Sequence, residues 1–274
     1  MTSWPSFAPS DENLMSATWK ADGLINTRSD NVNRFSRNFL KQAVCELRFP
    51  TLMELGEQRP PASFVKALRK DYPHLDMNNE FKLGIGSAQA GSSNIHILRS
   101  LKGNWSISLK ENALTVETTN YTGFEHLRAR ILQAVEATKG FIDSDFFTRI
   151  GLRYINLLRS ENDDVTNWIN PVLIEPIASE KFTGINDFGG RIQLLAPDGG
   201  CIFQHGIQLT TAKPDNAPDV EYMIDIDTYR TEVSLANTAA AIDVMHHQAF
   251  DLFDWAITEK AREFLTSEVK HRKE

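Results

Sequence analysis

The chain has 274 residues, of which 41% are hydrophobic and 24% charged, a globular composition that allows one large domain or two small ones. A formal net charge of −7 argues against general affinity for nucleic acid or anionic membrane, because both depend on excess lysine and arginine. No apolar run approaches the roughly 20 residues of a membrane-spanning helix, and the N-terminus does not resemble a signal peptide. Two cysteines, Cys45 and Cys201, fit reduced thiols, so we expect a cytoplasmic protein.

Residues 1–36 show little regular pattern and predict a poorly structured N-terminal arm. Trp4 and Trp19 stand in this arm among serine, aspartate and asparagine. One interpretation is a disordered arm. The other is an arm that docks onto a partner or a neighbouring subunit through its tryptophans, since rigid aromatic side chains are favoured anchors at interfaces.

Residues 37–146 predict a strand, a helix, three strands and a closing helix. From Gln42 to Phe49 apolar and polar residues alternate, which is typical of a half-buried strand. Pro60–Pro61 opens a helix, and Pro73 ends it. Three strands follow, near residues 95–101, 105–110 and 114–119, with a tight turn at Glu111–Asn112. The apolar period then changes to 3.6 residues between about Gly123 and Lys139.

Residues 147–274 repeat this order. The expected elements are a strand at 148–158, a short helix at 165–173, strands at 191–195, 201–210 and 221–229, and a helix of roughly 30 residues that starts at Asn237.

The whole chain therefore predicts an α+β fold. Two pseudo-repeated β-α-β-β-β-α halves would form curved antiparallel sheet(s) covered by long helices, because short links favour antiparallel pairing. Alternation along each strand predicts one buried and one wet face. Residue identity between the halves is faint, so coincidence remains the alternative to duplication.

Three segments carry a family resemblance: Phe39–Pro50 (FLKQAVCELRFP), Ile224–Arg230 (IDIDTYR) and Phe253–Leu265 (FDWAITEKAREFL). Their order and spacing are similar to those of a sporadically distributed family of uncharacterised bacterial proteins of about this length. The resemblance covers roughly residues 37–266, and the N-terminal arm departs from the family's usual start. It implies an accessory locus, such as a phage-defence or toxin–antitoxin operon, and it supplies no functional residues.

Asp225 and Asp227 are the main chemical candidates. They are two residues apart in a predicted strand, so both project from one face, where they could hold Mg²⁺ or Mn²⁺. The plainer interpretation is a solvated sheet face on which Arg149 and Arg153 pair with the two acids. Arg153 therefore completes a candidate polar or metal site with Asp225 and Asp227.

The last predicted helix contains His246, His247 and Asp251. His247 and Asp251 have the i, i+4 spacing of a zinc ligand pair. A further ligand would be needed, and no HExxH or CxxC motif is present. We therefore expect these histidines to be solvated rather than bound to metal.

The favoured functional hypothesis is a non-enzymatic protein-binding or assembly component without a cofactor. Trp4, Trp19 and Trp168 lie in irregular segments and are the candidate partner contacts. The partner would be a protein encoded in the same operon, and the chain would also self-associate, since sheet edges must be paired or protected. The alternative is a small-molecule or nucleotide sensor, or a metal-dependent enzyme, with a pocket between sheet and long helix that uses Asp225 and Asp227.

Overall fold

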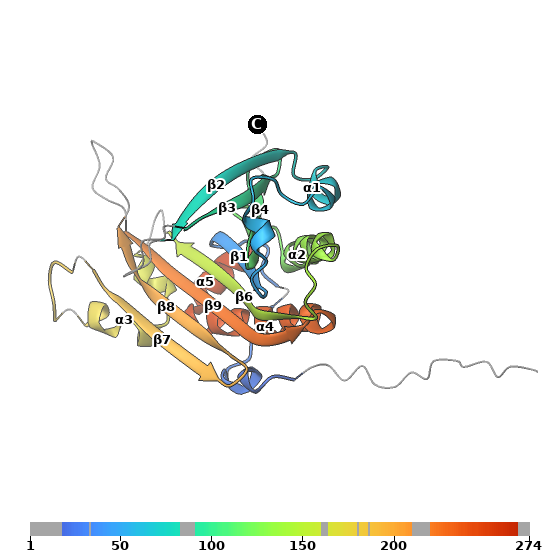
Figure 1. Ribbon diagram of the computed structural model, residues 1–274. Helices are drawn as coiled ribbons and strands as arrows, with labels where there is room; N and C mark the ends of the chain where they lie inside the picture. The colour runs from blue at the N-terminus through green and yellow to red at the C-terminus, as the bar shows by residue number, and fades with distance from the viewer. Residues whose placement is uncertain are drawn as a thin grey trace, which may run out of the picture.

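The alternating segments form one antiparallel sheet. The structure is a computed structural model that describes residues 18–32, 34–82, 91–159, 164–179, 181–185, 187–209 and 220–267. Within these residues nine strands follow the order β2-β3-β4-β5-β1-β6-β9-β8-β7, so β1 and β6 meet at the centre (Figure 1). The strands are β1 (Leu40–Arg48), β2 (His74–Lys82), β3 (Gly91–Arg99), β4 (Trp105–Lys110), β5 (Ala113–Thr118), β6 (Phe146–Leu158), β7 (Gly189–Ala196), β8 (Gly199–Leu209) and β9 (Val220–Ser234).

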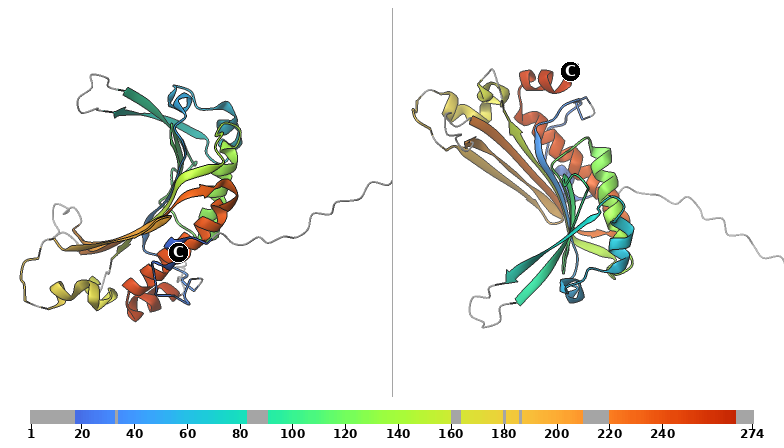
Figure 2. Two further views of the ribbon diagram at one scale, coloured as in Figure 1. Left: turned by 60° about the horizontal axis from the view of Figure 1, so that its bottom comes forward. Right: turned by 90° about the horizontal axis from the view of Figure 1, so that it is seen from above.

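The helices lie on one side of this sheet. Figure 2 shows the sheet curved into an open C, with the helices on its outer side and none on the inner side in the part of the chain that the structure describes. The helices are α1 (Ala62–Leu68), α2 (Phe124–Thr138), α3 (Pro171–Ala178), α4 (Thr238–Ala256) and α5 (Glu259–Thr266), with 3₁₀ turns η1 (Lys20–Gly23), η2 (Met53–Gly56), η3 (Val165–Trp168) and η4 (Leu235–Asn237). Among these described helices, none combines the length and apolar character that crossing a membrane requires.

The apolar period of the central strands decides which face the helices cover. Cys45 and Leu47 of β1 are fully buried, and their register partners on β6, Leu152 and Ile150, are buried on the same face. The residues between them point to the other face, because side chains alternate along a strand. We call the first the helix-covered face and the second the open face. One hydrophobic cluster under the helices includes residues from both halves of the chain.

The two cysteines belong to this buried layer. Cys45 and Cys201 are free and buried, as expected of thiols that serve as small hydrophobic residues. Burial raises the pKa of the Cys201 thiol to about 12, so it stays protonated at neutral pH.

The first half contains a strand that the sequence analysis did not include. β2 pairs with β3 along its full length and forms one edge of the sheet. Leu75 and Met77 alternate there with His74 and Asp76, a period-two signal that was present in the sequence. Both apolar side chains remain about half exposed, because β2 is an edge strand. The element order of the first half is therefore β-α-β-β-β-β-α. The prediction that both halves have the same order, β-α-β-β-β-α, is wrong.

The prediction of one long C-terminal helix that starts at Asn237 is also wrong. It is broken between α4, of 19 residues, and α5, of 8 residues. Ile257 is extended at the break and forms a β-bridge with Ile169. The backbone N–H of Asn170 donates to the Ala256 carbonyl at 2.9 Å. The segment after η3 thereby satisfies a carbonyl that would have accepted a hydrogen bond within a continuing helix.

The described part of the N-terminal arm packs on its own chain. Residues 18–32 and 34–36 contain only the η1 turn as regular structure, yet Ala21 and Ile25 are buried. The Asp198 carboxylate accepts hydrogen bonds from the Lys20 and Ala21 amides at 2.6 and 3.0 Å. These arm residues were expected to dock on a partner or a neighbouring subunit. They instead contact β7, β8 and α4 of the same chain.

A buried arginine fixes this arm. Arg230 of β9 is fully buried, and its Nη2 and Nε donate to Asp22 Oδ1 at 2.8 and 3.2 Å. Arg230 also donates to the Tyr229 carbonyl and to Gln248 of α4, whose side-chain nitrogen donates to the Ala21 carbonyl at 2.9 Å. The guanidinium is thereby neutralised by a residue that is 208 positions away in sequence.

Replacing Asp22 should destabilise the whole protein. Asp22→Asn leaves the Arg230 charge buried without its counter-ion, and we expect the free energy of unfolding to fall by roughly 3 kcal/mol. Urea denaturation followed by circular dichroism measures this change. Asp187→Asn, at an exposed position, is the control and should stay within about 0.5 kcal/mol of the parent. Equal stability of the two variants would show that the arm contributes nothing to the fold.

Candidate functional site

The carboxylates predicted from the sequence lie at the centre of the open face. Asp225 and Asp227 of β9 face β6, where Arg153 is the register partner of Asp227. Arg153 donates through Nε and Nη2 to the two oxygens of Asp225, at 2.8 and 2.5 Å. This bidentate bond raises the pKa of Arg153. Asp225 is only 4% exposed although none of the described helices covers it.

A second arginine continues the row of charges across the central strands. Arg149 Nη2 donates to Asp227 at 3.2 Å, and its Nη1 lies 3.8 Å from Glu46 of β1. Glu46 also accepts from Arg48 Nε at 2.7 Å. Burial raises the pKa of Asp227 even though Arg149 lowers it. The charges on this part of the open face therefore satisfy one another.

Two glycines leave room for the large side chains of this row. Gly151 and Gly200 are the register partners of Tyr229 on either side. A Cβ at Gly200 would lie 2.7 Å from the Tyr229 hydroxyl, and one at Gly151 would lie 2.5 Å from Arg149 Nη1. Tyr229 and Arg149 therefore lie flat on the sheet, with the guanidinium 4.7 Å from the ring centroid. The result is a rigid, shallow floor.

The geometry gives no support to a metal at Asp225 and Asp227. Both carboxylates are engaged by arginines, and the described residues contain no group of three or more histidine, cysteine or acidic residues that could hold an ion. The pairing with Arg149 and Arg153 is the plainer interpretation of the sequence, and the structure confirms it. Metal-dependent catalysis here stays a prediction.

The tryptophans expected to contact a partner have different surroundings. Trp4 lies outside the described residues. Trp19 is partly buried and packs against the core beside η1. Trp168 is 8% exposed, with its ring 5.5 Å from Phe39 and 5.0 Å from Phe264. The expected exposure of Trp168 is wrong, because the irregular segment around η3 is inserted beneath α5.

A cavity of about 1100 Å³ lies on the opposite, helix-covered face. It is bounded by α4, by the start of α2, by Val32 and by residues 35–40. Asp225, Asp227 and Arg153 do not line it, so the pocket expected between sheet and helix exists without the residues assigned to it. Its aromatic lining residues are Phe35, Phe39, Tyr121, Phe124, Tyr154, Phe250 and Phe253, together with His126, His246 and His247.

A chain of contacting rings crosses the base of this cavity. The rings of Tyr121 and Tyr154 meet edge to face with their centroids 6.0 Å apart, and Tyr154 Oη lies 3.0 Å from His246 Nδ1. The imidazole of His246 stacks on Phe124 with centroids 3.8 Å apart and planes within 7°. His246 is 8% exposed, so the solvated position expected for it is wrong. Burial lowers the pKa of His246 to about 3, which keeps the ring neutral.

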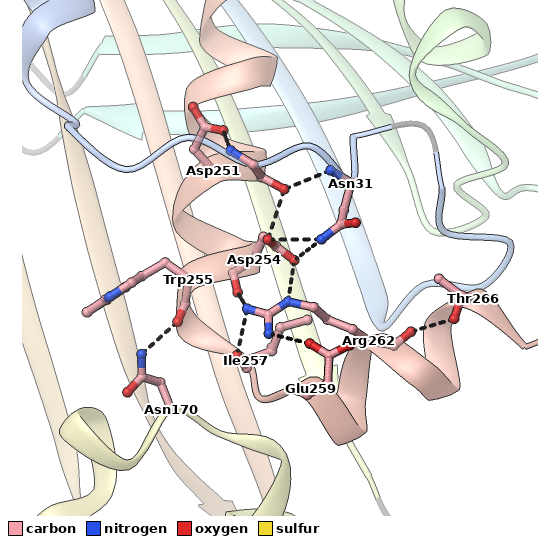
Figure 3. Close-up of polar contacts among 10 residues, drawn as sticks. Asn31, Asn170, Asp251, Asp254, Trp255, Ile257, Glu259, Arg262 and Thr266 are labelled. Carbon is pink, nitrogen blue, oxygen red and sulfur yellow. Dashed lines mark hydrogen bonds and ion pairs between the residues drawn. The ribbon is translucent and has the colours of Figure 1, made fainter.

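Polar contacts tie the N-terminal arm to the C-terminal part of α4, as Figure 3 shows. Asn31 donates to Asp254 of α4 at 3.3 Å, and Ser29 Oγ donates to the same carboxylate at 2.9 Å. Arg262 of α5 donates to Asp254 Oδ1 at 2.9 Å and also reaches carbonyls at the end of α4. Asp251, considered above as a zinc ligand, accepts the Ser29 amide at 2.8 Å instead. These bonds position Phe35, which packs on Phe250 and Phe253.

Comparison with known proteins adds no function to this geometry. The chain matches no protein-family profile and no curated protein. The open face and the cavity are therefore the two features of the molecule that bear on its function.

Acid should destabilise the protein through His246. The unfolded chain binds a proton on this histidine below its ordinary pKa of 6.5, whereas the folded chain does so only near its pKa of about 3. Stability linked to His246 is therefore complete above pH 6.5 and falls as the pH decreases toward 3, by about 1.4 kcal/mol per pH unit.

The variant His246→Phe keeps a ring against Phe124 but cannot titrate. Urea denaturation at pH 7 and pH 5 should show a smaller loss of unfolding free energy in the variant than in the parent protein. If both lose the same amount, His246 is not the group responsible.

Proposed function

We propose that the protein is a non-enzymatic binding component that holds another protein against the open face of its curved sheet. The observation that supports this most is the uncovered inner side of the C, where the central strands present a fixed polar floor (Figure 2). Arginine and tyrosine are the residue types most enriched at binding hot spots, and Arg149, Arg153 and Tyr229 occupy this floor.

The floor is prepared for binding because its side chains are already ordered. Arg153 is held by two hydrogen bonds to a buried carboxylate, yet 47% of its side chain remains exposed. A partner therefore meets guanidinium groups whose freedom is already restricted, which reduces the entropy lost on association. Because these charges are paired within the chain, the partner surface should be polar and of mixed charge rather than strongly acidic.

The family resemblance adds the expected setting. It implies a partner encoded in the same operon, in a bacterial accessory system of the phage-defence or toxin–antitoxin kind. This origin for the partner is part of the proposal.

We also propose that the two halves derive from one duplicated unit. The support is the strand order: from the centre outward it is β1, β5, β4, β3 on one side and β6, β9, β8, β7 on the other. A helix, α2 or α4, follows the last strand of each half, and β2 is an addition to the first. Duplication would explain why both arms of the C curve toward the same open face.

Bulky charge on the open face should abolish partner binding. Thr115→Lys on β5 and Gln204→Lys on β8 place long side chains on either side of the central floor, on the face of Glu46 and Asp225 respectively. Ala129→Lys, on the exposed side of α2, is the matched control. Tagged proteins expressed in the native host are compared for one stoichiometric partner. The proposal predicts loss only with the sheet variants; a partner lost with Ala129→Lys and kept with the sheet variants would contradict it.

Self-association should involve the sheet edges. β2 and β7 end the described sheet, and β7 exposes Ile192 and Leu195 by 45% and 62%. Such edges pair readily with another strand unless charges or prolines prevent it. We expect a dimer or larger species in size-exclusion chromatography with light scattering, and a smaller species after Ile192→Lys. A monomeric parent protein at micromolar concentration would refute self-association.

A further inference from the structure

We propose that the cavity between α4, the start of α2, Val32 and residues 35–40 is a binding site for a neutral, flat aromatic small molecule that carries one hydrogen-bonding group. The site lies on the helix-covered face and is independent of the protein-binding surface proposed for the open face.

The walls of the cavity are suited to flat rings. Phe35 lies 5.4 Å from Phe250, and Phe250 lies 6.5 Å from both Phe253 and His246. Ring pairs gain stability from stacked or edge-on contacts beyond the area they bury. The volume of about 1100 Å³ is at the upper end of the range for small-molecule sites and accommodates a two-ring or three-ring compound.

The charges around the cavity favour a neutral ligand. Its lining contains two arginines, Arg37 and Arg128, and two acids, Glu125 and Asp243. Arg128 is bound to Asp243 through two hydrogen bonds of 2.6 and 3.0 Å that join α2 to α4. Arg37 lies over the Phe264 ring and donates to the Ser267 carbonyl. The two positive and two negative groups balance, so a charged ligand would find no net opposite charge in this lining.

One polar atom is placed to orient the ligand. His246 Nδ1 is occupied by Tyr154 Oη, whereas Nε2 of this buried, cavity-lining ring has no partner among the described residues. Nε2 itself is not buried, so it is accessible from the cavity. A ligand hydroxyl or carbonyl that reaches Nε2 would form a hydrogen bond there, and because the imidazole is stacked on Phe124 the direction of this bond is fixed.

The first test uses the full chain and the neutral fluorescent probe N-phenyl-1-naphthylamine. We expect saturable binding at one site, displaced by 2-naphthol, while naphthalene-2-sulfonate competes at least about tenfold less well because of its charge. Absence of saturable binding would overturn the site. Equal competition by the sulfonate would overturn the assignment to neutral ligands.

Variants then place the probe in the cavity. Val32→Trp fills it and should weaken probe binding by about tenfold, whereas Met53→Trp adds the same ring at an exposed position outside it. His246→Phe should weaken competition by 2-naphthol by about fivefold, the value of one hydrogen bond, but change competition by naphthalene, which has no hydrogen-bonding group, by less than about twofold. Thermal unfolding confirms that each variant is folded. If Val32→Trp does not fold, the His246→Phe comparison decides whether the ligand binds in the cavity. Equal binding by the parent and the properly folded variants would place the probe elsewhere.

Discussion

The antiparallel pairing of β1 with β6 is the constraint on which the rest of the structure depends. It joins the two halves into one sheet, and its register sets which residues face the helices. Because Cys45 opposes Leu152 and Leu47 opposes Ile150, the apolar residues of both strands fall on one side. A slip of one residue would turn each of them toward the open face, since side chains alternate along a strand. The same register brings Glu46 within reach of Arg149.

The two faces divide the polar chemistry of the molecule. On the open face, arginines and carboxylates satisfy one another along the sheet. Beneath the helices, Tyr154 and His246 form a buried polar contact that opens into the cavity. Burial without a partner would be costly in either place, and the paired arrangement explains why Asp225 can be nearly inaccessible on a face that no helix covers. One surface suits a macromolecule and the other a small ligand.

Much of the fold followed from periodicity, because β1, β4, β5, β6, β8 and β9 each bury one face and therefore alternate clearly. The two-residue turn between β4 and β5 was predicted at its observed position. The edge strand β2 was missed although Leu75 and Met77 alternate with polar residues, because two apolar residues followed by Asn78, Asn79 and Glu80 are a weak strand signal. The helix break at Ile257 could not be predicted, because it is imposed by Ile169, a residue 88 positions earlier that bridges to it.

The sites were less predictable than the fold. Strand parity placed Asp225 and Asp227 on one face, and their pairing with Arg149 and Arg153 was one of two interpretations that the sequence left open. The cavity did not, because Tyr121, Tyr154 and His246 come from three separate elements and no local pattern relates them. A different consequence follows from the Asp22–Arg230 contact. Asp22 leaves the ribosome long before Arg230 exists, so this bond can close only after translation has passed β9. Such distant contacts slow folding, and the order of synthesis therefore makes the residues around Asp22 among the last to become native.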